Sequence, residues 1–295
     1  MTLLLSIGIF GIYSAALLAI GGVGFTLQFG VTNVLNLAFG SLLTACIFIE
    51  YGLTGHSTNL WVAMAVGAAS GALISLLVGH VVVGAFLRRG ATGIGIAMVT
   101  IAISLIVQFS LEAIQGPFIF AYTASTPSTF SIGGVVVSSS QLTVIGVAVV
   151  AMVAVHLLLR MTKLGLAMRA TAADVSLTRS CGVSPARTRA AAWLLSGALC
   201  GVCGVLLGIG EGSFSSSTGS DFFITLAAAA VLGGIGKPYG AMLGALLIGI
   251  VSQAAAAVIS PSYKTIAAWL ILIAVLILRP QGILAEFASE RELVA

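Results

Sequence analysis

The side chains that could carry out acid–base, nucleophilic or metal chemistry are few in this sequence, and they lie far apart. The three histidines, His56, His80 and His156, lack the short spacing that metal ligands on one element usually show. Asp174 and Asp221 are separated by a long apolar stretch and are not expected to form a carboxylate pair for acid–base catalysis. The sequence therefore predicts no catalytic residues, no metal site and no bound cofactor.

Two short motifs look like chemical sites but fit them poorly. Cys200-x-x-Cys203 lies within an apolar run, where thiols usually pack as small apolar side chains. The segment GGIGKP at 233–238 contains the Gly-Lys pair of a phosphate-binding loop. In such a loop, however, Val231 would be a glycine and Pro238 would be a Ser or Thr that serves Mg²⁺. We therefore predict helix packing for the first motif and no nucleotide site for the second.

The composition is that of a membrane protein with many crossings. Apolar residues make up 59% of the chain and charged residues 7%, whereas about a quarter of the residues in soluble domains are charged. Because a crossing needs about 20 apolar residues, we expect one all-α transmembrane domain over 1–295, with nine crossings, or eight if 20–40 is a single broken helix. The predicted crossings are 4–28, 36–52, 60–86, 92–112, 141–160, 190–210, 221–236, 239–259 and 264–279.

Glycines recur at four-residue spacing inside these apolar runs. Small residues on one face of a helix allow two backbones to approach closely. The pattern therefore predicts tight helix packing at four pairs: Gly67 and Gly71, Gly197 and Gly201, Gly204 and Gly208, and Gly240 and Gly244.

The basic residues predict an orientation in the membrane. Loops rich in Lys and Arg stay in the cytoplasm, and one arrangement of nine crossings places every basic residue except Lys264 on that side. The same arrangement places acidic residues at the outer ends of crossings, at Glu50, Glu112, Glu211 and Asp221. We expect an outer amino terminus, a cytoplasmic carboxyl terminus and a location in the cell membrane. The arginines are topology signals, so no nucleic acid is expected as a partner.

A polar segment, RATAADVSLTRSCGVSPARTRA at 169–190, interrupts the apolar chain. Thr171 and Asp174 have the spacing of a capping box and predict the start of a helix of about ten residues. Gly182 predicts its end, since glycine readily adopts the left-handed conformation found there.

A second helix is expected to follow at once. Ser184 is a suitable N-cap, and Pro185 fits the first helical position of a helix that continues into the next crossing. A helix of about ten residues is only marginally stable alone, so it must pack against this protein's crossings or a partner's surface. A basic loop that merely sets the orientation is the alternative, but it needs no caps.

Two groups of residues are candidates for a transport path. Asn33 and Asn36 are polar residues at helical spacing near the start of the second crossing, and they either form interhelical hydrogen bonds or line a path. The short segment from Asp221 ends in glycines, as the broken helices of transport sites do. Asp221 either caps that helix or receives substrate at the outer mouth. The glycines in question are Gly233, Gly234 and Gly236.

The polar segment and its surroundings resemble a known family. GLAMRATAADVSLTRSCGVSPARTRAAAWLLSGALCGVCGVLLG at 165–208 closely resembles the cytoplasmic loop and following helix of LivH-type permeases, which belong to ABC importers of branched-chain amino acids. GIYSAALLAIGGVGFTLQFGVTNVLNLAFGSLL at 11–43 and AAAAVLGGIGKPYGAMLGALLIG at 227–249 are similar to the first crossings and the late glycine-rich segment of that family.

The resemblance implies a transport subunit that is not itself an enzyme. ATP would be hydrolysed by cytoplasmic ABC ATPase subunits, and the coupling loop at 161–190 would dock on them. A second, related permease subunit (LivM-like), an external solute-binding protein and the lipid bilayer are the other implied partners. The coupling residues implied by the resemblance are Arg169, Thr171, Asp174, Arg179, Gly182, Val183, Ser184, Pro185 and Arg187.

The chain departs from the family pattern in its first-crossing motif. Where the family usually carries His and Glu, this sequence has Phe39 and Ser41. The resemblance implies a branched-chain amino acid as the substrate, and this departure leaves urea or a short amide as the alternative. A secondary transporter or channel driven by an ion gradient is the alternative from a different class.

Overall fold

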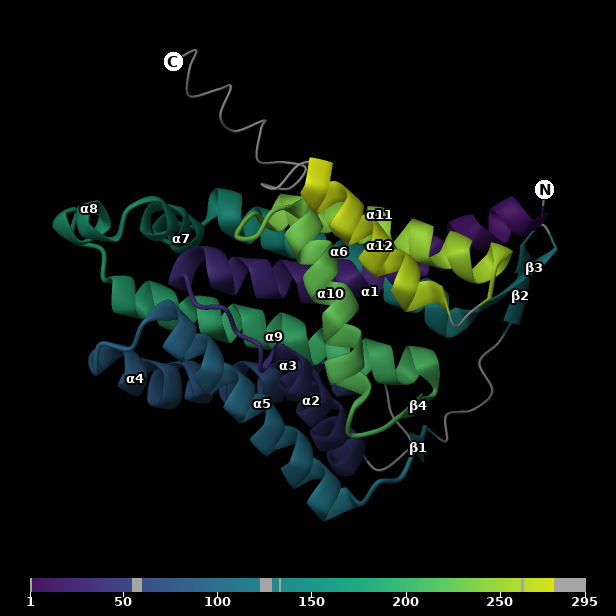
Figure 1. Ribbon diagram of the computed structural model, residues 1–295, viewed down its shortest axis with the longest axis horizontal. Coiled ribbons are helices and arrows are strands. Elements are labelled where there is room, and N and C mark those ends of the chain that lie inside the picture. The colour runs from purple at the N-terminus through teal and green to yellow at the C-terminus, as the bar shows by residue number, and fades with distance from the viewer. Residues whose placement is uncertain (1, 55–59, 123–128, 133, 261–262, 279–295) are drawn as a thin grey trace, which may run out of the picture.

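The chain folds into an elongated bundle of helices, described by a computed structural model over residues 2–54, 60–122, 129–132, 134–260 and 263–278 (Figure 1). The helices are α1 (Thr2–Thr32), α2 (Phe39–Thr54), α3 (Leu60–Leu77), the π-helical turn η1 (Val78–Val83), α4 (Gly84–Arg88), α5 (Gly93–Gln115), α6 (Ser139–Met161), α7 (Lys163–Ala173), α8 (Val175–Ser180), α9 (Pro185–Glu211), α10 (Thr218–Gly233), α11 (Pro238–Val258) and α12 (Lys264–Leu278). The short strands are β1 (Phe120–Ala121), β2 (Thr129–Ile132), β3 (Val135–Ser138) and β4 (Ser213–Phe214).

The predicted all-α membrane architecture is confirmed. Within the described residues, six helical spans are long and apolar enough to cross a membrane, and three apolar helices, α2, α10 and α12, are shorter. Each predicted crossing coincides with one of these segments. The third crossing is built from α3, η1 and α4 in succession.

The first two crossings are separated by a break in the helix. α1 runs on to Thr32, beyond the predicted end of its crossing, and α2 begins only at Phe39. Asn33 ends α1 because its φ of 53° lies in the left-handed region, which asparagine adopts more readily than most residues. Residues 33–38 are therefore not helical, and Asn33 and Asn36 do not share the helical spacing that we expected.

α9 forms the centre of the bundle. In its apolar stretch 72% of the residues are buried, more than in the other long spans of the described chain. It packs against α1, α2 and α3, and α1 in turn packs against α11. Figure 1 shows α9 running along the long axis of the molecule between these neighbours.

The contact between α3 and α9 has no space for side chains. A Cβ added at Gly201 would collide with the carbonyl oxygen of Gly67, and one added at Gly71 would collide with that of Gly197. Without a Cβ, the two backbones meet directly. The predicted role of these four glycines in close packing is confirmed.

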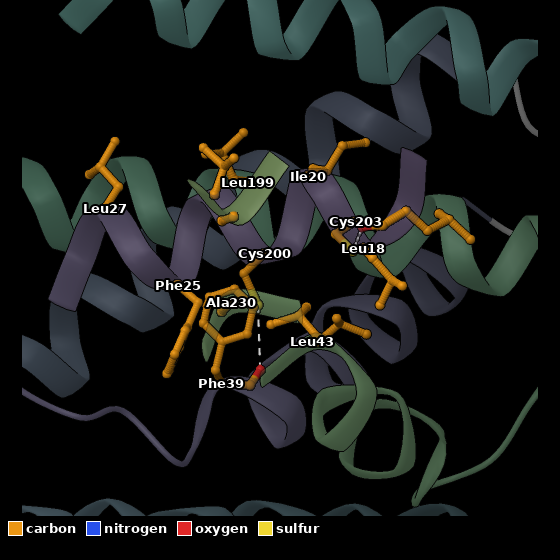
Figure 2. Close-up of a cluster of buried hydrophobic side chains, with 14 of the residues drawn as sticks. Leu18, Ile20, Phe25, Leu27, Phe39, Leu43, Leu199, Cys200, Cys203 and Ala230 are labelled. Carbon is orange, nitrogen blue, oxygen red and sulfur yellow. Dashed lines mark hydrogen bonds between the residues drawn. The ribbon is translucent and has the colours of Figure 1, made fainter. Parts of the chain in front are cut away.

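Buried apolar side chains from α1, α2, α9 and α10 fill the middle of the bundle (Figure 2). The thiol of Cys200 donates a hydrogen bond of 3.5 Å to the carbonyl oxygen of Phe39, and that of Cys203 donates one of 3.4 Å to Leu17. Both cysteines are buried and free. The Cys-x-x-Cys motif thus packs α9 against its neighbours, as predicted.

Short strands and aromatic rings cover one end of the bundle. β1 pairs with β4, and β2 forms an antiparallel hairpin with β3. The Tyr122 hydroxyl donates a 2.6 Å hydrogen bond to the buried carboxylate of Glu50 on α2. Burial, and then this bond, raise the pKa of Tyr122 well above its ordinary value. The rings that surround this pair are Phe48, Tyr51, Phe120 and Phe214.

Charged residues separate between the two ends of the bundle. Figure 1 places α4, α7, α8 and the start of α9 at one end, which we call the α8 end. Glu211, the last residue of α9, marks the opposite Glu211 end. Of the basic residues that the structure describes, only Lys264 lies at the Glu211 end, where it lines a cavity with that glutamate. The predicted division of charge is therefore present in the fold.

The contact between α3 and α9 makes a prediction about stability. Gly201→Val places a branched side chain against the backbone of Gly67, and overpacking of this kind costs about 1–3 kcal/mol. We expect a lower thermal unfolding midpoint for the detergent-solubilised protein. Gly146→Val on α6 is the matched control, because Gly146 is exposed and has no atom near its missing Cβ. Equal midpoints for the two variants would contradict the packing described here.

Candidate functional site

The polar segment 161–190 folds at the α8 end into α7, α8 and the first turn of α9. α7 begins after Thr162, whose hydroxyl oxygen accepts a hydrogen bond from the Gly165 N–H at 3.0 Å. Thr171 lies in the last turn of α7, is buried, and donates a 2.7 Å hydrogen bond to the carbonyl oxygen of Ala167. The prediction that Thr171 caps a helix was wrong, because the favourable helix formers before it continue α7 through this position.

Asp174 is the residue that caps α8. Its backbone is extended, and its carboxylate accepts hydrogen bonds from the N–H groups of Ser176 at 2.7 Å and Leu177 at 3.0 Å. The Ser176 hydroxyl donates a third bond of 2.7 Å. These bonds, the Ser176 side chain first, lower the pKa of Asp174. α8 has six residues, fewer than the ten expected, because its cap lies three residues later than Thr171.

The other end of α8 matches the prediction. Gly182 has a φ of 80°. Its N–H donates a hydrogen bond to the carbonyl oxygen of Arg179 at 3.0 Å, and the Val183 N–H donates one to the carbonyl oxygen of Thr178 at 3.2 Å. Ser184 then occupies the N-cap position of α9, although its side chain makes no capping bond. Pro185 is the first residue of α9, which continues without interruption into the membrane span.

α8 projects from the bundle at this end (Figure 1). Thr178 is its only buried residue, Leu177 has 64% of its surface exposed, and Arg179 is exposed, as is Arg187 on the first turn of α9. A helix this short is unstable on its own, and its two ends are held by Asp174 and Gly182. α8 therefore presents an apolar and a basic side chain to the outside rather than to this protein's own crossings.

Two cavities lie beside the polar segment. One, of about 370 Å³, is lined by Arg169 together with residues of α1, α6 and the α10–α11 turn. The other, of about 440 Å³, is lined by Asn33, Arg189, Gly236 and Lys237. Asn33, Arg169 and Gly236 are thus brought to one end of the bundle, although they come from separate parts of the sequence.

Asn36 is enclosed in the break between α1 and α2. It is 1% exposed, its amide nitrogen donates a 3.2 Å hydrogen bond to the Gln28 side-chain oxygen, and its own oxygen accepts from the Ala38 N–H at 3.2 Å. The Ser196 hydroxyl of α9 also donates to the Gln28 oxygen, at 3.1 Å. Of the two alternatives for Asn36, these contacts support hydrogen bonding between segments.

Thr100 forms hydrogen bonds with backbone groups of the same non-helical segment, residues 33–38. Its hydroxyl donates to the Leu35 carbonyl at 3.2 Å and accepts from the Leu37 N–H at 3.2 Å. Sequence reasoning missed Gln28, Thr100 and Ser196 as members of this site. The available signal was their polarity within apolar runs, but single Thr and Ser residues are common in membrane helices, where they bond to their own backbone.

The glycine-rich turn between α10 and α11 lies at the α8 end. α10 ends at Gly233, and Gly234 and Gly236 have φ values of 104° and 86°, which side-chain-bearing residues rarely adopt. A Cβ on Gly30 of α1 would come within 2.8 Å of the Gly236 carbonyl oxygen. α10 is short, as expected, and Figure 1 shows it inclined steeply to α9.

Asp221 lies at the opposite end from the other candidate residues. Ser217 holds the N-cap position of α10, so the alternative in which Asp221 caps this helix was wrong. The exposed Asp221 side chain lines a cavity of about 300 Å³ with Glu211 and Lys264. The structure therefore groups Asp221 with two charged residues that we had treated only as topology signals.

The fold, the separated charges and α8 define a multi-pass membrane protein with a projecting helix at one end and a cavity lined by charged residues at the other. The chain belongs to the family described as the permease component of branched-chain amino acid transport systems, whose family model matches residues 8–276. This confirms the family resemblance of the sequence.

Characterised relatives cover almost the whole chain. The chain is 29% identical to the high-affinity branched-chain amino acid transport system permease protein BraD of Pseudomonas aeruginosa, over 92% of this chain and 93% of that protein. It is 27% identical to the corresponding protein LivH of Escherichia coli K12, over 95% of each. The ribose import permease protein RbsC of the same strain is 25% identical over 80% of this chain and 73% of its own. No solved structure matches the chain.

The cap of α8 makes a prediction about local order. Asp174→Ala removes the acceptor for two backbone N–H groups, so the amides of 175–180 should exchange hydrogen faster in mass spectrometry. Asp174→Asn keeps an acceptor oxygen and should have a smaller effect. Ser184→Ala is the control, since the Ser184 side chain caps nothing, and faster exchange in that variant at α9 would contradict the assignment.

The lowered pKa of Asp174 gives the same cap a pH dependence. Stabilisation by a carboxylate with a lowered pKa is complete above the ordinary Asp value of about 3.9 and is lost as the pH falls through the lowered value. The exchange rate of α8 in the wild-type protein, corrected for intrinsic exchange, should therefore rise only below about pH 4. Asp174→Asn should not show this rise.

Proposed function

We propose that this chain is a permease subunit of an ATP-driven importer of branched-chain amino acids. The observation that carries the proposal is the family match over residues 8–276, which spans the bundle and the α8 end alike. The relatives BraD and LivH are named for branched-chain amino acid transport. In this proposal the chain forms part of the translocation path and hydrolyses no ATP itself.

The α8 end would be the cytoplasmic end and the site of coupling. Its basic residues agree with the rule that positive loops stay in the cytoplasm. α8 has capped ends, little contact with the bundle and an exposed Leu177, as expected for a helix that inserts into a partner's cleft. Coupling to cytoplasmic ATPase subunits explains both caps, whereas a loop that only sets orientation would need neither.

The other partners follow from the same proposal. A second, related permease subunit would complete the path, and an external solute-binding protein would deliver substrate to the Glu211 end. The carboxyl terminus, which lies outside the described residues, would be cytoplasmic. Asn33, Asp221 and the glycines of the α10–α11 turn are proposed to border the path at its two ends.

Uptake by the reconstituted transporter tests the function. Proteoliposomes that contain this chain, its ATPase subunits and its companion permease should accumulate labelled leucine, isoleucine or valine when ATP and the binding protein are supplied. Uptake of urea without the amino acids would overturn the proposed substrate. Uptake driven by an ion gradient in the absence of ATP would show a secondary transporter instead.

A substitution on α8 tests the coupling. Leu177→Glu changes a side chain that is 64% exposed, so the protein should fold normally. It should nevertheless recover less ATPase on copurification and take up roughly tenfold less substrate. Leu87→Glu on α4 is the matched control, an exposed leucine near the same end. Equal ATPase recovery from the two variants would rule out docking through α8.

A further inference from the structure

The cavity at the Glu211 end has the composition of a ligand site. It lies between α1, α9, α10, α11 and α12 and has a volume of about 300 Å³, at the lower limit of the usual range of about 300–1,000 Å³ for small-molecule sites. Charged side chains reach it from three helices: Glu211 from α9, Asp221 from α10 and Lys264 from α12. None of the roles described above involves Glu211, Asp221 and Lys264 together.

Within the part of the chain that the structure describes, the fold does not use these three charged groups for ion pairs or side-chain hydrogen bonds. All three residues are exposed, and within the described residues none of them forms an ion pair closer than 4 Å or a side-chain hydrogen bond, although Lys264 attracts the Glu211 carboxylate electrostatically. Two carboxylates and one ammonium thus border a common space.

The rest of the lining is mixed. Apolar side chains lie beside hydroxyl-bearing residues, which are Tyr13, Ser14, Thr218, Thr225, Ser252 and Thr265. Leu17 and Leu207 are buried and border the cavity, and the half-buried ring of Phe222 lies on the same lining. Thr265 also borders the cavity, next to Lys264 in the sequence. The apolar part of the lining, beside the three charged residues, suits a ligand that carries both charged and aliphatic groups.

The signs of the charges select the ligand class. A simple cation would be attracted by Glu211 and Asp221, which outnumber Lys264, and a simple anion would be attracted by Lys264 alone, so neither pairs with all three groups. A zwitterion can place its ammonium near the carboxylates and its carboxylate near Lys264 at the same time. Urea is neutral, so it cannot form an ion pair with any of the three charged residues.

We infer that this cavity binds free aliphatic α-amino acids as zwitterions, before they pass further along the bundle. The α-ammonium lies between Glu211 and Asp221, the α-carboxylate meets Lys264, and the branched side chain packs against Leu17, Leu207 and Phe222. The inference rests on the proposed function and adds to it a location and a chemical basis for selectivity on the permease itself.

Binding of three probes of similar shape tests the inference. L-leucine carries both charges, 4-methylpentanoate lacks the ammonium, and 3-methylbutylamine lacks the carboxylate. Saturation-transfer NMR and calorimetry on the complete transporter assembly in nanodiscs, without binding protein, should show that leucine binds at least about tenfold more tightly than either analogue.

Variants of the cavity residues should change which of the three probes binds most tightly, and not only how tightly each one binds. Glu211→Gln combined with Asp221→Asn should weaken leucine about tenfold and strengthen 4-methylpentanoate relative to it. Lys264→Gln should instead favour 3-methylbutylamine. Glu112→Gln and Lys163→Gln are matched controls, because neither residue borders the cavity, and both should retain the wild-type order. A general loss of stability would not invert the order of the probes.

Two results would overturn the inference, and they differ from a failure of the proposed function. The first is an unchanged order of probe affinities in the cavity variants. The second is wild-type uptake of leucine with no measurable binding that depends on Glu211, Asp221 or Lys264. In both cases ATP-driven uptake by the wild-type assembly would leave the transport function standing. If the wild-type assembly takes up no branched-chain amino acid, the function itself is wrong and this inference falls with it.

Discussion

The direct contact between the backbones of α3 and α9 determines how the rest of this bundle can be arranged. In a membrane, apolar side chains gain little from leaving lipid, so association depends on packing and on hydrogen bonds. The glycines of α3 and α9 let the two backbones meet without intervening side chains. α9 then remains close enough to α1 and α2 for its thiols and for Ser196 to bond to them.

The break at 33–38 shows the second constraint on the fold. Backbone groups in an apolar interior need partners from the protein itself, since no water is available there. Thr100 supplies these partners from α5, and Asn36 closes the turn through Gln28 and the Ala38 N–H. A side chain that belongs to a distant helix thus makes the interruption of α1 and α2 possible.

Patterns local to the sequence predicted the crossings, the separation of charge, the end of α8 at Gly182 and the start of α9 at Pro185. Each of these depends on the composition of one segment or on the conformational range of one residue. The position of the α8 cap was harder, because Thr171 and Asp174 both suit a helix start and only the extent of α7 decides between them. The break could not be assigned, since nothing near Asn36 identifies Gln28 or Thr100 as its partners.

The same limit applies to the cavity at the Glu211 end. Glu211, Asp221 and Lys264 were each recognised as charges at helix ends, but their meeting depends on how α9, α10 and α12 are packed. The resemblance to a family indicated the transport class and the loop at 161–190. It did not indicate which charged residues share a space.

α9 connects the two ends of the bundle as well as forming the centre of its core. Its 27 residues form one uninterrupted helix of about 40 Å, which starts at the turn below α8 and ends at the cavity that contains Glu211. Its backbone also lies directly against that of α3. In the proposed coupling, a force applied at α8 would therefore be passed along α9 and its neighbour α3 to the walls of the distant cavity.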